Sequence, residues 1–220
     1  MNLDGPRLEP RSRTARQLVV FLHGYGADGN DLIGLGREWA PMLPHAAFVS
    51  PHAPEPCGMA PMGRQWFNLT FRDPGEMVRG VKHASPALNA FLDSELKRHD
   101  LPARALALVG FSQGTMLALG AGLARQPPPA AIVGYSGALA TVEALPNNPA
   151  EAPAILLVHG DMDEVIPVEA MFAAREQLAQ SGIAVEWHMA QGIGHGIDGE
   201  GLRLGGDFLK QAFAATAALK

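Results

Sequence analysis

Short apolar runs alternate with longer amphipathic segments along the whole chain. The runs are rich in Val, Leu and Ile, which is typical of strands that helices cover on both faces. Between the runs, apolar residues recur at helical spacing, as at Leu88, Leu92 and Leu96. This alternation predicts an α/β fold with a mostly parallel central sheet. The expected strands are residues 18–22, 47–50, 105–109, 131–134, 155–159 and 185–189.

Glycine and proline mark where the predicted helices end. Ser181-Gly182 follows a helical run, and glycine tolerates the left-handed conformation that closes many helices. Three prolines at positions 127–129 stop another helix. Ser85-Pro86 fits either a helix start or a kink in a longer helix that begins near Met77, and the sequence leaves both open.

Length and composition fit one globular domain. The chain has 220 residues, of which 47% are hydrophobic and 18% charged, so disordered and fibrous architectures are poor interpretations. A chain of this length can form a single α/β core. We expect one domain over residues 17–220, preceded by an N-terminal extension or edge segment over residues 1–16.

Charge and cysteine content restrict the partners and the compartment. The net charge is −5 and the Lys and Arg residues are scattered, so no basic stripe is available for nucleic acid. The apolar runs are far shorter than the roughly 18 residues that cross a bilayer, so no membrane span is expected. Cys57 is the only cysteine, which excludes an intramolecular disulfide. The N-terminal residues lack the apolar core of a secretory signal, and we expect a cytoplasmic protein.

The strongest chemical signal is a serine between two glycines. An apolar strand over residues 105–109 leads into Gly110-Phe111-Ser112-Gln113-Gly114, and an apolar helical run follows. This is the strand, G-x-S-x-G, helix context of a nucleophile elbow, in which crowded backbone leaves no room for a Cβ at the two glycines. The competing interpretation is an ordinary glycine-rich turn in which Ser112 caps the helix.

A serine hydroxyl needs a base, and the base needs an acid to orient it. Asp163 lies in the turn after the strand at residues 155–159 and is our candidate acid, with Asp161 as the competitor. His195 lies in a glycine-rich loop before the last helix and is our candidate base. The order Ser112, Asp163, His195 is the order found in α/β-hydrolases.

The amides that stabilise an oxyanion come from the residue after the nucleophile and from a loop after an early strand. Gln113 supplies the first backbone N–H. Tyr25, in the glycine-rich loop that follows residues 18–22, is our candidate for the second. The spacing Gly24-x-Gly26-x-x-Gly29 also matches a dinucleotide fingerprint, which would suit a nucleotide-dependent oxidoreductase. No acidic residue ends the next strand, which argues against that interpretation.

Two other features bear on ligands. Residues 51–64 are interrupted by proline and glycine, which predicts a long irregular loop of the kind that often has a function. Met59, Met62, Trp66 and Phe67 lie in or just after it, and we expect them to line an adaptable acyl-binding groove. Exposed apolar residues near such a groove would also suit a homodimer. A zinc site built from His23, His159 and His195 is conceivable, but these histidines lack the spacing of a known ligand set, so no metal is expected.

Taken together, these motifs resemble the phospholipase/carboxylesterase family of small α/β-hydrolases, which includes bacterial carboxylesterases and acyl-protein thioesterases. The resemblance spans nearly the whole chain. It implies an α/β-hydrolase catalytic domain without a large cap, a Ser112, His195 and Asp163 triad, an oxyanion hole at Tyr25 and Gln113, and no cofactor. The motifs are Leu22-His23-Gly24-Tyr25-Gly26, Gln65-Trp66-Phe67, Gly110-Phe111-Ser112-Gln113-Gly114, His159-Gly160 with Asp163 and Ile166-Pro167, and Gly194-His195.

These observations favour a serine carboxylesterase that hydrolyses small-molecule esters of short to medium acyl chains. Lysophospholipid hydrolysis and protein deacylation are the alternatives within the same chemistry. Asn68 stands where thioesterase-like members carry an aspartate, which makes the thioesterase role less secure. A binding protein without activity on the same scaffold is the alternative from another class, because a fold alone does not establish activity.

Overall fold

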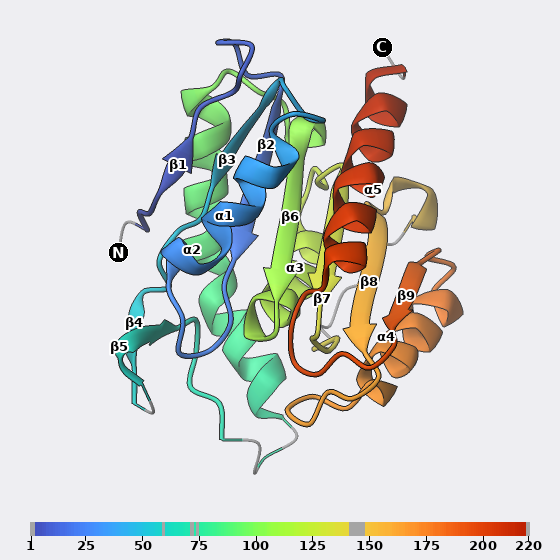
Figure 1. Ribbon diagram of the computed structural model, residues 1–220. Coiled ribbons are helices and arrows are strands. Elements are labelled where there is room, and N and C mark those ends of the chain that lie inside the picture. Colours follow the sequence, from blue (N-terminus) through green and yellow to red (C-terminus); the bar gives the residue numbers. More distant parts are fainter. Residues whose placement is uncertain (1–2, 59, 71–72, 74, 141–147, 219–220) are drawn as a thin grey trace.

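The computed structural model describes residues 3–58, 60–70, 73, 75–140 and 148–218. A seven-stranded sheet has the order β1-β3-β2-β6-β7-β8-β9, and β4 and β5 form a separate hairpin (Figure 1). All neighbours in the large sheet are parallel except β1 and β3. The strands are β1 (Arg7–Leu8), β2 (Gln17–Leu22), β3 (Ala46–Val49), β4 (Glu55–Cys57), β5 (Ala60–Gln65), β6 (Leu106–Phe111), β7 (Ala131–Tyr135), β8 (Ala154–Gly160) and β9 (Glu186–Ala190).

Helices cover both faces of the sheet, as the apolar strands predict. Helices α1 and α5 pack on one face, and α2, α3 and α4 pack on the other (Figure 1). Short 3-10 turns precede β6 and β8, at Ala103–Ala105 and Pro149–Glu151. The helices are α1 (Gly29–Trp39), α2 (Glu76–Arg98), α3 (Gln113–Ala124), α4 (Glu169–Gln180) and α5 (Gly199–Ala218).

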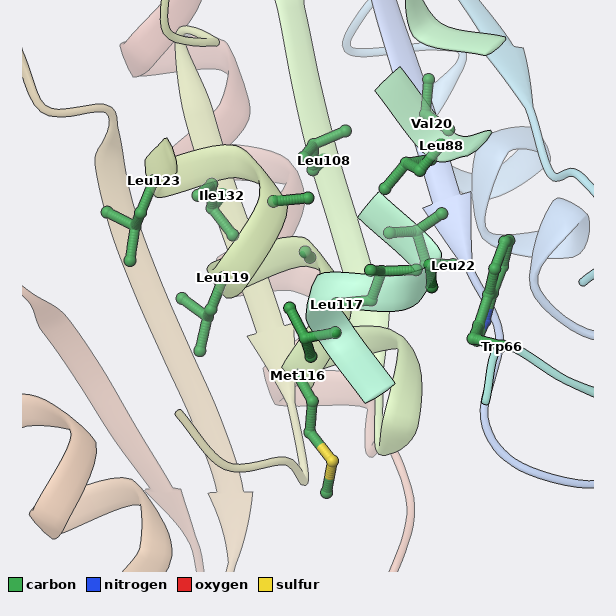
Figure 2. Packing of buried hydrophobic residues seen from close by; sticks show 14 of the residues in the cluster. Val20, Leu22, Trp66, Leu88, Leu108, Met116, Leu117, Leu119, Leu123 and Ile132 are labelled. Carbon is green, nitrogen blue, oxygen red and sulfur yellow. The ribbon is translucent and has the colours of Figure 1, made fainter. Parts of the chain in front are cut away.

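Helix α3 lies at the centre of the larger core. All its residues from Gln113 to Leu123 are buried, because it packs between β6 and β7 on one side and α2 on the other. Figure 2 shows Met116, Leu117 and Leu119 of this helix among side chains from the sheet and from α2. A helix that is apolar all round is stable only in such surroundings. The start of α3 is therefore fixed relative to the sheet.

The predicted α/β architecture and its six strands are confirmed, with ends that differ by at most two residues. The helix-end predictions are confirmed as well: α3 ends before the prolines, and Gly182, which follows α4, has a φ of +73°. The ambiguity at Ser85-Pro86 is resolved in favour of a long helix. Pro86 lies inside α2, and the Ser85 hydroxyl donates a hydrogen bond of 2.6 Å to the Val81 carbonyl.

The prediction that residues 51–64 form an irregular loop was wrong in part, because β4 and β5 pair there as an antiparallel hairpin. Its register shifts between Pro56 and Cys57, which fits a short strand that contains proline. The Gln65 amide donates to Glu55 across the hairpin at 3.0 Å. Local composition could not reveal this pairing, since a strand of three residues with a proline at its centre has no period to detect.

Strand β1 was also not among the expected strands. It pairs with β3 at the edge of the sheet, and the Arg7 guanidinium on this strand binds Glu95 of α2. The two nitrogen–oxygen distances are 3.1 and 2.8 Å, and Glu95 is only 4% exposed. A buried carboxylate needs such a partner because it has left water. The ion pair thus attaches the N-terminal segment to the core. No helix within the described ranges is long and apolar enough to cross a membrane.

Replacing Arg7 by alanine should leave the Glu95 carboxylate buried without its cation. We expect Arg7→Ala to lower the free energy of unfolding by about 2–4 kcal/mol, measured by urea denaturation. Adding Glu95→Gln should cost little in this background, because the stranded charge is then removed. Strictly additive losses in the double variant would contradict this account.

Candidate active site

Ser112 lies in a strained turn between β6 and α3. Its φ is +54° and its ψ is −116°, a region that residues with a side chain rarely occupy. The Ser112 N–H donates to the Tyr135 carbonyl at the end of β7, at 2.9 Å, and its own carbonyl accepts from Thr115 at 3.0 Å. The turn is therefore fixed from the neighbouring strand and from the helix. The Ser112 side chain makes no capping hydrogen bond to α3, which contradicts the helix-cap interpretation.

The two glycines beside Ser112 are required by close backbone contacts. A Cβ on Gly110 would lie 2.4 Å from the Thr115 nitrogen, and one on Gly114 would lie 1.8 Å from the Leu22 carbonyl oxygen. Both distances are far below any real contact of a Cβ. The predicted steric reason for the G-x-S-x-G pattern is confirmed.

The structure distinguishes between the two candidate acids. The Asp163 side chain is fully buried, and its Oδ2 lies 2.8 Å from His195 Nδ1. Its Oδ1 accepts two backbone hydrogen bonds of 2.9 Å, from Val165 and Ile166. Asp161 instead accepts from the Gly192 N–H at 2.7 Å, within the loop that carries the histidine. Asp163 is thus the carboxylate that contacts His195.

Burial and hydrogen bonding act in opposite directions on Asp163. Burial raises the pKa of its carboxyl group, but the hydrogen bonds from His195, Ile166 and Val165 lower it further than burial raises it. The net effect is a pKa below the ordinary value of an aspartate. Asp163 therefore remains ionised at neutral pH and can only accept hydrogen bonds.

The loop that carries His195 packs against the end of β8 and against the elbow. A Cβ on Gly160 would lie 2.2 Å from the Ile193 carbonyl oxygen, so glycine lets the loop cross the strand end closely. The His195 ring lies 4.9 Å from the ring of Phe111, the residue before Ser112, measured between centroids. The two residues lie at the same edge of the sheet, but the described residues show no hydrogen bond between the Ser112 hydroxyl and the His195 ring.

The loop after β2 lies directly over the elbow. A Cβ on Gly24 would lie 3.3 Å from the Cβ of Ser112. The buried His23 ring supports this loop: its Nδ1 is 2.8 Å from the Gly24 carbonyl oxygen, and its Nε2 accepts from the Ala53 N–H at 3.0 Å. Tyr25 follows Gly24 in this loop and Gln113 follows Ser112 in the elbow, so each candidate oxyanion residue is next in the chain to a residue of this contact.

The glycines of the dinucleotide-like spacing have structural roles. Gly26 has a φ of +81°, and a Cβ on Gly29 would lie 2.1 Å from the Ser50 carbonyl oxygen. The start of α1 is capped by the Asp28 carboxylate, which accepts from the Asn30 N–H at 2.7 Å. A phosphate at this helix end would meet a negative charge. The spacing thus reflects packing.

The side chain of Gln113 makes contacts that the sequence did not reveal. Its Oε1 accepts from the Trp66 N–H at 2.9 Å, and its Nε2 donates to the Phe67 carbonyl at 2.8 Å. The Trp66 indole N–H in turn donates to the His23 carbonyl at 2.9 Å. Gln113 therefore links the elbow to the segment after β5 and, through Trp66, to the loop after β2. Residues about 47 positions apart leave no local signal of such a contact.

The predicted acyl-binding groove needs correction. Trp66 and Phe67 are 1% and 2% exposed and belong to the core, because the indole nitrogen has a buried partner and the Phe67 ring packs closely on Gly80. Met62 is 93% exposed on the hairpin, and Met59 lies outside the described residues. The space next to the Tyr25 loop is an open hollow of about 580 Å³. It is lined by Gly26, Ala27, Asp28, Asn30, Asp31, Ala60, Met62 and Gly63.

Adding a methyl group at Gly114 should disrupt the elbow. We expect Gly114→Ala to lower the free energy of unfolding by about 3 kcal/mol or more, because the Cβ collides with the backbone of β2. Gly34→Ala is the matched control: it lies in α1 with no atom within 4 Å of the new Cβ. That change should stabilise the protein by about 0.5–1 kcal/mol. If the two variants had the same midpoint of thermal unfolding, the close contact between Gly114 and the Leu22 carbonyl would not determine the stability of the fold.

Comparison with known proteins agrees with this arrangement. The profile of the phospholipase/carboxylesterase family matches residues 3–213. Esterase YpfH of Escherichia coli (strain K12) is 30% identical over 198 residues, which cover 90% of this chain and 84% of that protein. The crystal structure of esterase PE8 has a TM-score of 0.88 at 40% identity, and covers 96% of this chain and 100% of that one. Arabidopsis thaliana SOBER1 shares the fold, with a TM-score of 0.73, 23% identity, and coverage of 90% of this chain and 99% of that one.

These likenesses confirm the predicted α/β-hydrolase fold, since the match with esterase PE8 extends over both chains almost completely. They also confirm the resemblance drawn from the sequence motifs, because the family profile covers nearly the whole chain. The chain therefore belongs to the phospholipase/carboxylesterase family of ester-hydrolysing enzymes.

Proposed function

We propose that this enzyme is a serine carboxylesterase that cleaves esters of short to medium acyl chains through an acyl-enzyme at Ser112. The observation that carries the proposal is the pairing of His195 with a buried, ionised Asp163 beside a strained serine turn. This is the constellation that activates a hydroxyl for nucleophilic attack. The names of esterase YpfH and esterase PE8 agree with ester hydrolysis.

The contact with Asp163 determines which nitrogen of His195 is basic. An ionised carboxylate only accepts hydrogen bonds, so the Nδ1 at 2.8 Å carries the proton. In the neutral ring, Nε2 is then left with a free lone pair. This nitrogen is the base that the mechanism requires for the Ser112 hydroxyl. Hydrogen bonds of this kind are often long in unliganded enzymes and tighten when substrate binds.

In the first half-reaction, Ser112 Oγ attacks the ester carbonyl carbon and its proton passes to His195 Nε2. The carbonyl oxygen becomes an oxyanion, which accepts hydrogen bonds from the backbone N–H groups of Tyr25 and Gln113. Gln113 is the first residue of α3, so its N–H has no acceptor within the helix and lies at the positive end of the helix dipole. The tetrahedral intermediate expels the alcohol, which takes the proton from His195, and Ser112 remains acylated.

In the second half-reaction, water replaces the alcohol. His195 Nε2 removes a proton from the water as it attacks the acyl carbon, and His195 returns this proton to Ser112 Oγ when the second tetrahedral intermediate collapses. Asp163 stays ionised throughout and stabilises the positive charge on His195. The products are a carboxylic acid and free enzyme.

The shape of the surroundings supports short to medium acyl chains. The hollow next to the Tyr25 loop is open, and its lining includes Met62, Asp28 and Asp31. We propose that the acyl chain lies in this hollow, where an open surface with two carboxylates cannot shield a long alkyl chain from water. The burial of Trp66 and Phe67 leaves no deeper apolar groove at those residues.

Removing the nucleophile tests the mechanism. We expect Ser112→Ala to fold normally and to lose turnover of p-nitrophenyl esters by about 10⁴-fold or more, because the residual site retains only binding and oxyanion contacts. Labelling by a fluorophosphonate probe should disappear as well. Ser181→Ala, which changes a serine at the end of α4, is the matched control and should keep full activity. Normal turnover by highly purified Ser112→Ala would refute the mechanism.

The acyl-chain preference follows from the same assay. With acetyl, butyryl, octanoyl and palmitoyl esters, kcat/KM should be highest at or below eight carbons. A maximum at palmitoyl, or turnover confined to lysophospholipids or thioesters, would replace the substrate class while leaving the Ser112 mechanism intact.

A further inference from the structure

The carboxylate of Asp163 has a second histidine beside it that the reaction steps above do not use. His159 Nε2 lies 3.2 Å from Asp163 Oδ2, the same oxygen that contacts His195. It also lies 2.8 Å from the carbonyl oxygen of Ile166. The His159 ring is 1% exposed, so solvent does not compete for these contacts.

The proton on this ring can be placed by its partner. A backbone carbonyl only accepts hydrogen bonds, so the nitrogen that faces Ile166 must carry hydrogen. The Nε2–H of His159 therefore donates to Ile166, and Asp163 Oδ2 lies 3.2 Å from the same nitrogen as a close electrostatic contact. This assignment requires no charge on the His159 ring.

Together these bonds form a closed network around the acid. Ile166 donates its N–H to Asp163 Oδ1 and accepts from His159 through its carbonyl. His159 in turn contacts Asp163 Oδ2. Oδ1 thus accepts from the Ile166 N–H, and Oδ2 lies against the ring that is bound to the Ile166 carbonyl, so a rotation of the carboxylate would disturb both contacts.

The network is anchored in the rigid part of the fold. His159 is the second-last residue of β8, which is paired with β7 on one side and with β9 on the other. Asp163 and Ile166 lie in the turn that follows. The His159 side chain connects the strand to this turn, so the position of Asp163 is fixed relative to the sheet.

We propose that His159 is a positioning residue: its Nε2, which donates its hydrogen to the Ile166 carbonyl and lies 3.2 Å from Asp163 Oδ2, orients the acid so that Oδ2 faces His195. The inference rests on the proposed function, because it assigns a role in orienting the triad. His159 touches no substrate and acts through Asp163 alone. Its removal should therefore lower kcat and leave KM almost unchanged.

Substitutions at His159 separate the hydrogen bond from the bulk of the ring. His159→Gln places an amide N–H near the position of Nε2 and should keep kcat within about fivefold of wild type. His159→Leu removes the donor and should lower kcat by about 10- to 100-fold, with KM changed by less than about twofold. His188→Leu, a histidine on β9 in register with Val158, is the matched control and should keep full kcat. If His159→Leu does not fold, His159→Asn is tested instead, since its shorter amide does not reach Ile166.

A double variant tests whether the effect passes through the acid. In the Asp163→Asn background, His159→Leu should cause almost no further loss of kcat, because the group that it positions is already gone. A loss as large as in wild type would overturn the proposal and indicate a general packing role. Wild-type kcat in folded His159→Leu would also overturn it. Failure of the Ser112 mechanism would appear separately, as fluorophosphonate labelling and turnover that do not depend on Ser112.

Discussion

The candidate active-site edge of this enzyme depends on the close packing of α3 against the ends of β2 and β6. Gly114 lies so near the Leu22 carbonyl that a single methyl group would collide with it. The backbone must therefore turn sharply, and it does so at Ser112, in a conformation that costs energy. The cost is offset by the buried apolar surface of α3 and by the hydrogen bond from Ser112 to Tyr135. The strained backbone of Ser112, a residue that is only 8% exposed, is thus a consequence of core packing.

Backbone partners hold most of the polar side chains around that serine. His23 is held by Gly24 and Ala53, and the side chain of Gln113 holds the backbone of the segment after β5. Asp163 combines two backbone N–H donors with His195. Backbone groups in and beside the sheet move little, so they orient these side chains before any substrate binds. Such preorganisation is what stabilises developing charge at low cost.

The regular part of the fold was predictable because its physical signal is local. A strand buried on both faces reads as an apolar run, and the six predicted strands were therefore recognised. Strand β1 and the β4–β5 hairpin were missed for the opposite reason. Strands β1 and β4 have only two and three residues, β5 is interrupted by proline and glycine, and β1 is held by a distant partner through the Arg7–Glu95 ion pair.

The sequence by itself determined the elbow around Ser112, because Gly110, Gly114 and the change from strand to helix all lie close together in one short segment of the chain. It also predicted the candidate acid and base, through their order along the chain and their positions after strands. Only the tertiary structure decided that Asp163 rather than Asp161 contacts His195, that Trp66 and Phe67 are buried, and that His159 also contacts the acid. The physical reason is that these facts depend on where side chains from separate elements meet, and the periodicity of one segment contains no information about the segments that it touches.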